Sequence, residues 1–330
     1  MLTIPRRKIL KQLLAGWGGW ELCVAHAEDW PTKPVKIVVP FPPGGYADVY
    51  ARLLAEHMEV AWGQPVTVHN RPGNGGVVGA GAVAQAVGDH QTLLMGTVGT
   101  HAINASLFAR LPYHPVTDFS AISLVVQAEG VLVVPAASPA RTVQELIGLA
   151  RTHNNFSFAS AGPGTTSHLA GELFRHKNRL NLIHVPYKGN SPALIDLIGG
   201  QTSMMFATLQ TVMPHLQSGR LRALAVLGAL STTPPPLVRG LPSLAKSPWM
   251  GKALENWAGL FGPAGMSAAV VQKIHAQVQR ILQLPVVQAR MHAEGMHFVP
   301  MSSHEFSQFV LQEILAWRET VQASGAVIEG

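Results

Sequence analysis

Two glycine-rich turns constrain the fold of this chain most, because each lies between a strand-forming run and a helical pattern. The first turn runs from Val38 to Asp48 and the second from Phe158 to His168. Such a turn gathers unpaired backbone N–H groups and the positive end of a helix dipole at one point. A point of this kind can hold an anion. Because more than a hundred residues separate the turns, we expect two lobes that each bring one turn to a shared cleft.

The length and composition fit this expectation. A chain of 330 residues suits two lobes better than a single core. Hydrophobic residues make up 47% of the chain and charged residues 13%, which supplies apolar material for two buried sheets and argues against disorder.

The first 27 residues have the layout of a secretory signal peptide. A basic stretch at 5–11 precedes an apolar run at 13–24, and Ala25-His26-Ala27 places small residues at −3 and −1. We therefore expect cleavage near Ala27 and a mature protein in the periplasm. Two export routes fit this segment. One is the Sec route, and the other is the twin-arginine route, because Arg6-Arg7 resembles a twin-arginine pair. A membrane anchor is the weaker alternative, because the run is shorter than the roughly 20 residues that span a bilayer.

The single cysteine, Cys23, lies inside this segment. The mature chain therefore has no disulfide, thiolate nucleophile or zinc–thiolate site. Removal of the segment takes four basic residues and one acid, so the formal charge falls from +6 to +3. A nucleic-acid partner is not implied.

Short β-rich runs alternate with amphipathic stretches along the mature chain, which predicts an α/β fold with parallel sheets covered by helices. The predicted strands are 35–39, 66–68, 92–95, 156–160, 182–185, 203–206, 223–227 and 256–261. The predicted helices are 48–62, 142–151, 267–284 and 303–323. Gly63 ends the first helix, and Thr142-x-x-Glu145 and Ser302-x-x-Glu305 are capping boxes for the second and the last.

The order of these elements predicts how the lobes are connected. A chain that leaves the first lobe near Gln127 and returns near Trp257 crosses between lobes twice, which makes a hinged cleft. We accordingly assign 28–127 with 253–330 to lobe 1 and 128–252 to lobe 2.

Several motifs follow one another in a specific order. They include Pro40-Phe41-Pro42-Pro43-Gly44-Gly45-x-x-Asp48, Asn70-Arg71-Pro72-Gly73-x-Gly75-Gly76, Gly99-Thr100-His101, Ser160-Ala161-Gly162-x-Gly164-Thr165, Val185-Pro186-Tyr187-Lys188-Gly189 and Trp257-x-Gly259-Leu260-Phe261. In this order they resemble the Bug-type extracytoplasmic solute receptors of the tripartite tricarboxylate transporter family. The resemblance implies a two-lobed periplasmic-binding-protein fold of the Venus flytrap, type II-like kind. It also implies a monomer without catalysis or cofactor that passes a small organic acid to integral-membrane permease subunits.

The candidate ligand-binding residues come from the two turns and from neighbouring strand ends. They are Pro43, Gly44, Gly45, Tyr46, Thr97, Gly99, Thr100, Ser160, Gly162, Thr165, Thr166 and Ala207. Glycines at 44 and 45 allow backbone amides to approach a carboxylate and tolerate positive φ, although a plain turn is the alternative. Ligands of open α/β sheets bind beyond the carboxyl ends of strands, which favours hydroxyl donation by Thr97 and Thr100.

Other residues near these turns have less specific roles. We expect Asp48 and Ser167 to cap helices and His168 to be packed and hydrogen-bonded, whereas Lys188 either faces the cleft or is solvated. Family members commonly have a small hydroxyl residue where Tyr46 stands. Its phenol narrows the pocket, hydrogen-bonds the ligand or points outward. Phe206-Ala207-Thr208 lacks the acid that relatives often carry there, which favours carboxylates and neutral or aromatic acids over amino acids.

Two other functions are weaker alternatives. An exported α/β enzyme acting on a small acid is one, but the third glycine of a dinucleotide loop would fall on Val78. The segment Ala159-Ser160-Ala161-Gly162 also lacks the leading glycine of a nucleophile elbow. A metal receptor is the other, yet none of the fourteen histidines beyond residue 27 forms an i, i+4 pair with an intervening acid.

Overall fold

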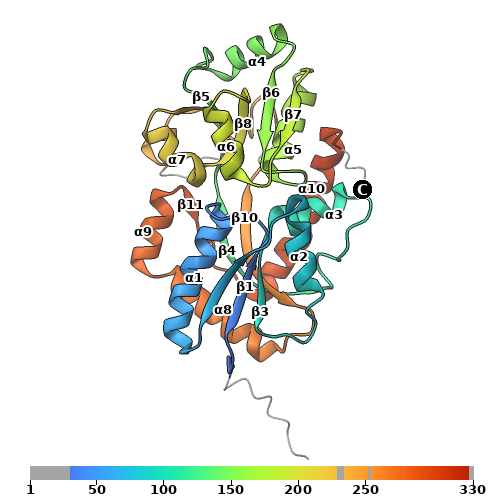
Figure 1. The fold of residues 1–330 in the computed structure, drawn as a ribbon, viewed down its shortest axis with the longest axis vertical. Coiled ribbons are helices and arrows are strands. Elements are labelled where there is room, and N and C mark those ends of the chain that lie inside the picture. The colour runs from blue at the N-terminus through green and yellow to red at the C-terminus, as the bar shows by residue number, and fades with distance from the viewer. Residues whose placement is uncertain (1–29, 229–233, 252–253, 327–330) are drawn as a thin grey trace, which may run out of the picture.

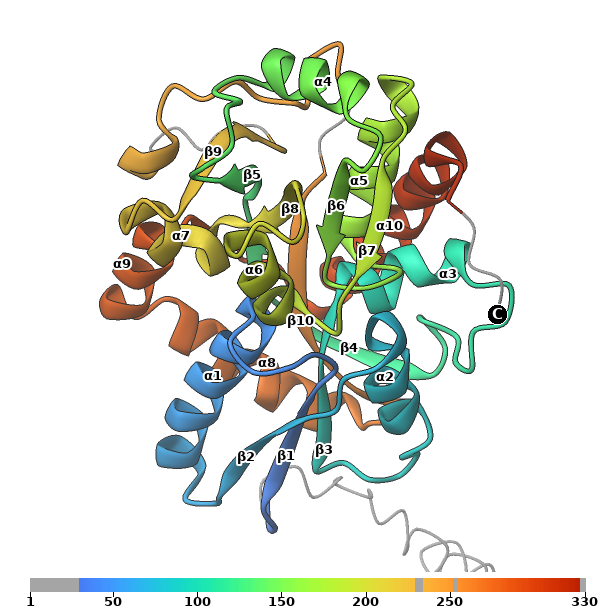
Figure 2. The ribbon, with the colours of Figure 1, turned by 45° about the horizontal axis from the view of Figure 1, so that its top comes forward.

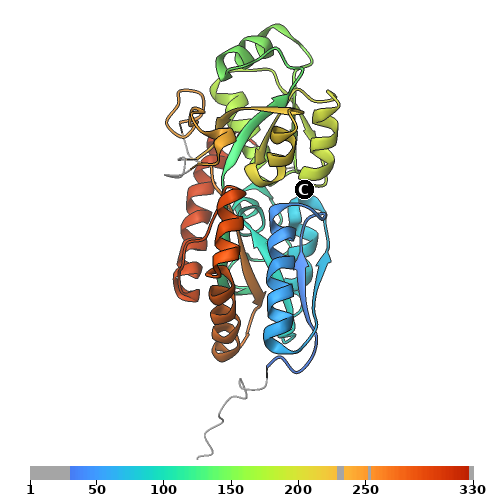
Figure 3. The same ribbon diagram turned by 90° about the vertical axis from the view of Figure 1, so that its left-hand side faces the viewer.

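The computed structural model describes residues 30–228, 234–251 and 254–326. The expected signal peptide and Cys23 lie outside these ranges. Two β-sheets form the centres of two α/β lobes, which are stacked along the long axis of the molecule (Figure 1, Figure 3).

Lobe 1 is built on a six-stranded sheet with the order β11-β4-β10-β3-β1-β2. Its strands are β1 (Val35–Val39), β2 (Val66–Asn70), β3 (Thr92–Thr97), β4 (Phe119–Ala128), β10 (Asn256–Pro263) and β11 (Met296–His297). Its helices are α1 (Tyr46–Trp62), η1 (Asn74–Gly76), α2 (Val77–Ala84), η2 (Gly99–Ile103), α3 (Asn104–Leu107), α8 (Ala268–Leu282) and α9 (Pro285–Ala293).

Lobe 2 is built on a five-stranded sheet with the order β7-β6-β8-β5-β9. Its strands are β5 (Gly130–Pro135), β6 (Ser157–Ser160), β7 (Ile183–Pro186), β8 (Met204–Thr208) and β9 (Leu221–Val226). Its helices are α4 (Val143–Thr152), α5 (Thr166–Lys177), α6 (Asn190–Ile198), α7 (Leu209–Gln217) and η3 (Pro236–Val238).

The eight predicted strands are confirmed, with ends that shift by at most two residues. Two of the three predicted helix signals are confirmed in full. At the third, Thr142 Oγ1 accepts from the backbone N of Glu145, but the Glu145 carboxylate accepts from the backbone N of Arg141, so the predicted capping box is only half formed. Gly63 ends α1 in the left-handed conformation at φ 63°, and its N–H donates to the carbonyl of Glu59. Ser302 and Glu305 form a complete capping box at the start of the last helix, α10 (Ser303–Ser324).

The sheets are mixed, so the prediction of purely parallel sheets is wrong. β1 pairs in parallel with β2 and β3, but β10 runs antiparallel to β3 and β4. In lobe 2, β5 runs antiparallel to β8 and β9. A parallel neighbour requires a crossover within the same lobe. The chain instead continues from β4 through Glu129 into β5 of the other sheet, and β10 later returns beside β4.

The last helix, α10, joins the two lobes. It lies beside α5 of lobe 2 and α3 of lobe 1 (Figure 2). Its Phe306 and Val310 belong to one apolar core with Leu173 and Phe174 of α5. The indole Nε1 of Trp257, at the start of β10, donates to the Glu313 carboxylate over 2.8 Å. Within the described ranges, no helix combines the length and apolarity that crossing a bilayer requires.

Candidate functional site

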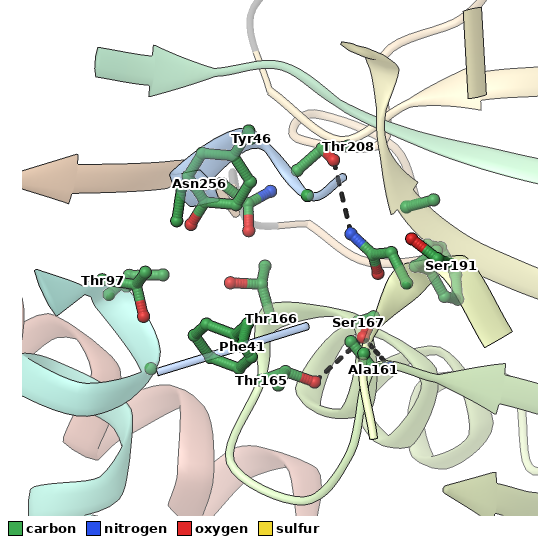
Figure 4. A pocket seen from close by; sticks show the side chains of 18 of the residues that line it. Phe41, Tyr46, Thr97, Ala161, Thr165, Thr166, Ser167, Ser191, Thr208 and Asn256 are labelled. Carbon is green, nitrogen blue, oxygen red and sulfur yellow. Dashed lines mark hydrogen bonds between the residues drawn. The ribbon is translucent and has the colours of Figure 1, made fainter. Parts of the chain in front are cut away.

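A pocket lies where the two lobes meet (Figure 4). It encloses about 720 Å³ of space that is partly open to solvent. Lobe 1 contributes Phe41, Pro42, Gly45, Tyr46, Ala47, Asp48, Thr97, Val98, Gly99 and Asn256. Lobe 2 contributes Ala161, Thr165, Thr166, Ser167, Gly189, Asn190, Ser191, Phe206, Ala207, Thr208 and Leu227.

The strand order explains why these segments meet. β1 and β3 are parallel neighbours, so the turn after β1 lies next to Thr97 at the end of β3. In lobe 2, the parallel strands β6, β7 and β8 end at the same edge, which brings the N-termini of α5, α6 and α7 to the pocket. The first turns of these three helices contain no acid. The positive ends of their dipoles are therefore left for an anion.

Seven of the twelve predicted residues line this pocket: Gly45, Tyr46, Thr97, Gly99, Thr165, Thr166 and Ala207. Five lie behind it or beside it: Pro43, Gly44, Thr100, Ser160 and Gly162. The Thr100 hydroxyl accepts from the backbone N of Thr97 over 2.9 Å, and Ser160 bonds to His184 over 2.7 Å. Gly162 lines a neighbouring cavity that also contains Lys188.

The sequence reasoning did not select several other lining residues. Thr208 follows the predicted strand 203–206, so the strand-end rule that selected Thr97 could have found it. Asn190 and Ser191 begin a helix directly after β7 and carry the same signal. Asn256 begins a strand, a position with no such signal, and reaches the pocket because β10 returns between the lobes.

The first turn is held by Asp48. Gly44 has a φ of 90° and donates its backbone N–H to Asp48 Oδ2 over 3.0 Å. The N-cap of α1 is Gly45, which has no side-chain cap, and Asp48 lies within the first turn, so the expectation that Asp48 caps this helix is wrong. Gly45 has a φ of −77°, so of these two glycines Gly44 is the one that adopts a positive φ. The Arg52 guanidinium lies 2.9 Å from the Asp48 carboxylate, and Asn70 Nδ2 donates to it over 2.8 Å. Burial by itself raises the Asp48 pKa, but these hydrogen bonds and the Arg52 charge lower it below its ordinary value.

Tyr46 is the first residue of α1, and its buried ring forms part of the pocket wall (Figure 4). Its hydroxyl donates to the carbonyl oxygen of Trp257 over 3.2 Å. Burial raises the pKa of this phenol, which stays neutral. The ring therefore narrows the pocket, whereas the hydroxyl donates its hydrogen bond to Trp257 within lobe 1.

The second turn is held by Thr165. Its Oγ1 accepts from the backbone N of His168 at the start of α5, so Thr165 is the cap and the expectation that Ser167 caps this helix is wrong. Ser167 Oγ instead accepts from the backbone N of Ala161 over 2.9 Å. Thr166 differs from both. Within the described part of the chain, its Oγ1 is buried and has no hydrogen-bond partner.

Two stacked histidines, His168 and His184, pack next to this turn. The rings of His168 and His184 are stacked with centroids 4.4 Å apart, and the His184 Nε2 lies 2.7 Å from Ser160 Oγ. Burial and nearby positive charge lower the pKa of His168 to about 3 and that of His184 to about 4, so both rings are neutral at physiological pH. Ligand atoms of the two histidines and Glu172 lie within 4.8 Å of one another. Arg175 already neutralises the Glu172 carboxylate at 2.6 Å, which weakens the case for a metal there.

The pocket is nearly uncharged, and its lining exposes more apolar than polar surface. Among the described residues that line it, Asp48 alone has an ionised side chain, and Arg52 neutralises it. The lining offers hydroxyl groups, amides, helix N-termini and aromatic rings. This arrangement suits a small anion held by neutral donors.

Two α/β lobes with such a pocket between them define a periplasmic-type solute-binding protein. The family model described as the tripartite tricarboxylate transporter family receptor matches residues 50–326, so the chain belongs to this family.

Individual relatives agree with this assignment. BugT of Bordetella pertussis is 32% identical over 92% of this chain and 93% of its own length. The solved structure of the periplasmic binding protein BugD is 31% identical with a TM-score of 0.85, over 91% of this chain and 100% of that one. An R. palustris protein solved with adipate is 30% identical with a TM-score of 0.85, over 90% of this chain and 99% of that one.

Proposed function

We propose that this chain is a periplasmic receptor that binds a small organic acid between its lobes. It delivers the acid to the integral-membrane permease of a tripartite tricarboxylate transporter. Family membership and the adipate-bound relative support this function. The observation that carries it is the buried, unpartnered Oγ1 of Thr166 at the N-terminus of α5, on the wall of the pocket.

The chemistry of Thr166 explains why a carboxylate fits. A buried hydroxyl without a partner costs roughly 1–3 kcal/mol, and an acceptor oxygen from a ligand removes this penalty. The carboxylate also lies at the N-terminus of α5, where the helix dipole favours negative charge. A ligand held in this way needs no arginine clamp.

The proposed contacts are the predicted residues that line the pocket: Gly45, Tyr46, Thr97, Gly99, Thr165, Thr166 and Ala207. Pro43, Gly44, Thr100, Ser160 and Gly162 support the turns from outside the lining. The body of the ligand packs against the rings of Tyr46, Phe41 and Phe206.

The remaining parts of the proposal concern the whole molecule. Residues 1–27 act as a signal peptide that is cleaved near Ala27. Lobe 1 comprises 28–127 with 253–330, lobe 2 comprises 128–252, and the two close around the ligand as a monomer. We propose that the protein binds its ligand without transforming it.

Native mass spectrometry of the exported protein separates a receptor from an enzyme. The protein is incubated with malate, adipate, benzoate and glutamate, and both the complex and the solution are analysed. We expect one unchanged carboxylic acid bound per chain. Conversion of any of these acids would support the enzyme, and failure of every carboxylate to bind would contradict the proposed function.

A further inference from the structure

The lobes touch at several points around the ligand pocket. A Cβ on Gly99 of lobe 1 would lie 2.9 Å from the carbonyl oxygen of Gly164 in lobe 2. A Cβ on Gly189 of lobe 2 would lie 2.8 Å from Pro42 Cδ in lobe 1. The Ser191 hydroxyl donates to the Pro43 carbonyl over 3.3 Å.

A still closer approach to a backbone atom of the other lobe involves Gly75 in η1. A Cβ on Gly75 would overlap the carbonyl oxygen of Pro163, in the turn between β6 and α5. A backbone oxygen cannot rotate away as a flexible side chain can. Asn104 Nδ2 donates to the Gly75 carbonyl over 3.3 Å, so Gly75 is itself fixed to lobe 1.

We propose that Gly75 is an affinity-determining position outside the ligand pocket, because only a residue without a Cβ lets the lobes reach this closed arrangement. Gly75 does not line the ligand pocket but a neighbouring cavity. Any side chain there holds the lobes apart at Pro163. The apparent affinity falls with the fraction of molecules that can close. The expected effect of a Gly75 substitution on ligand affinity rests on the proposed receptor function. Its expected effect on lobe closure does not.

Gly63 provides a matched control for the backbone conformation. Gly75 has φ 61° and ψ 26°, and Gly63 has φ 63° and ψ 21°. Both are left-handed, so the same substitution strains both positions similarly. A Cβ on Gly63, however, would have nothing within 4 Å. Asparagine is the substitution of choice, because it tolerates the left-handed conformation better than other residues with a Cβ.

Closure can be measured without knowing the natural ligand. In the full chain with Cys23→Ala, Pro43→Cys and Ser191→Cys place two exposed thiols across the interlobe contact between Ser191 and Pro43, in which Gly75 takes no part. Dibromobimane bridges them only when the lobes are together. We expect Gly75→Asn to slow bridging by about tenfold or more, and Gly63→Asn to leave it within about twofold of the parent. Gly75→Ala, with the smallest side chain, should act in the same direction.

Equal bridging rates in the parent and Gly75→Asn would overturn the inference, as would a parent that does not bridge. If Gly75→Asn alone failed to fold by circular dichroism, Gly75→Ala would decide between these outcomes. Addition of malate, adipate or benzoate then tests the proposed function separately. If none accelerates bridging in the parent while Gly75→Asn still slows it, closure at Gly75 stands and the proposed function is contradicted.

Discussion

The hydroxyl of Thr165 donates a hydrogen bond to the carbonyl oxygen of Gly162 over 2.6 Å. Thr165 Oγ1 also accepts from the backbone N of His168 and so caps α5. Thr165 therefore shapes the turn that faces the ligand, whereas the neighbouring Thr166 keeps its hydroxyl available. Substitution of each threonine in turn can therefore distinguish a residue that shapes the turn from one that binds the ligand.

Thr166→Val should weaken carboxylate binding by about 1.5–3 kcal/mol, the usual range for a hydrogen bond to a charged group. Its free energy of unfolding should not fall, because the lost hydroxyl has no partner in the free protein. Isothermal titration and urea unfolding measure the two quantities. Thr152→Val, at the exposed end of α4, is the control. Unchanged affinity in Thr166→Val would exclude this hydroxyl as a contact.

Thr165→Val should show a different pattern. Loss of the N-cap lowers the free energy of unfolding by about 0.5–2 kcal/mol. Affinity should fall only through disorder of the turn that ends at Thr165, because the Thr165 hydroxyl is used within the turn and the proposed contact of Thr165 with the ligand is through its backbone. A large loss of affinity at unchanged stability would show that the Thr165 hydroxyl contacts the ligand directly.

Tyr46→Phe should retain most of the affinity, because the ring remains in the pocket wall. The lost hydrogen bond to the Trp257 carbonyl should lower stability by about 0.5–1.5 kcal/mol. Tyr46→Ser removes the ring and should change which acids of the panel bind. Competition among malate, adipate and benzoate measures this preference, and an identical order in wild type and Tyr46→Ser would exclude Tyr46 as a determinant of specificity.

Asp48 should make stability depend on pH in the acid range. Its folded pKa is lowered below the ordinary 3.8, so its ionised form stabilises the fold above this value. This contribution is lost as the pH falls from about 3.8 through the lower, folded pKa. Urea unfolding of wild type should therefore weaken more steeply in this window than that of Asp48→Asn. Parallel curves would show that Asp48 has the same pKa in both states.

The histidine pair predicts a second pH dependence. The pKa of His168 is lowered from 6.5 to about 3, so the unfolded chain binds more protons between these values and stability falls as the pH drops below 6.5. His168→Gln should reduce this loss, whereas substitution of the exposed His176 on the same helix should not. Nitrogen chemical shifts at pH 5 should show a neutral His168, and a protonated ring would contradict the account.

The sequence predicted those parts of the fold that local rules determine. The strand–turn–helix units around Gly44 and Thr165, the left-handed Gly63 and the capping box at Ser302 depend on neighbouring residues, and sequence spacing identifies them. The antiparallel direction of β10 depends on how the chain returns between lobes, which no local pattern carries.

The site was predictable to a similar degree. The strand-end rule identified Thr97, and the second glycine-rich turn identified Thr166. The strand-end rule also selected Thr100, and it could not tell that Thr100 hydrogen-bonds the Thr97 backbone inside lobe 1. Asn256 reaches the pocket through the arrangement of the lobes. The Gly75–Pro163 approach is equally invisible in the sequence, because the two residues meet only across the lobes.

A crystal structure with the acid that binds most tightly in the panel tests the central claim most directly. We predict one carboxylate oxygen of that acid at hydrogen-bonding distance from Thr166 Oγ1, at the N-terminus of α5, with the body of the acid against Tyr46. Electron density for the acid outside this pocket, with the Thr166 hydroxyl still without a partner, would contradict the account.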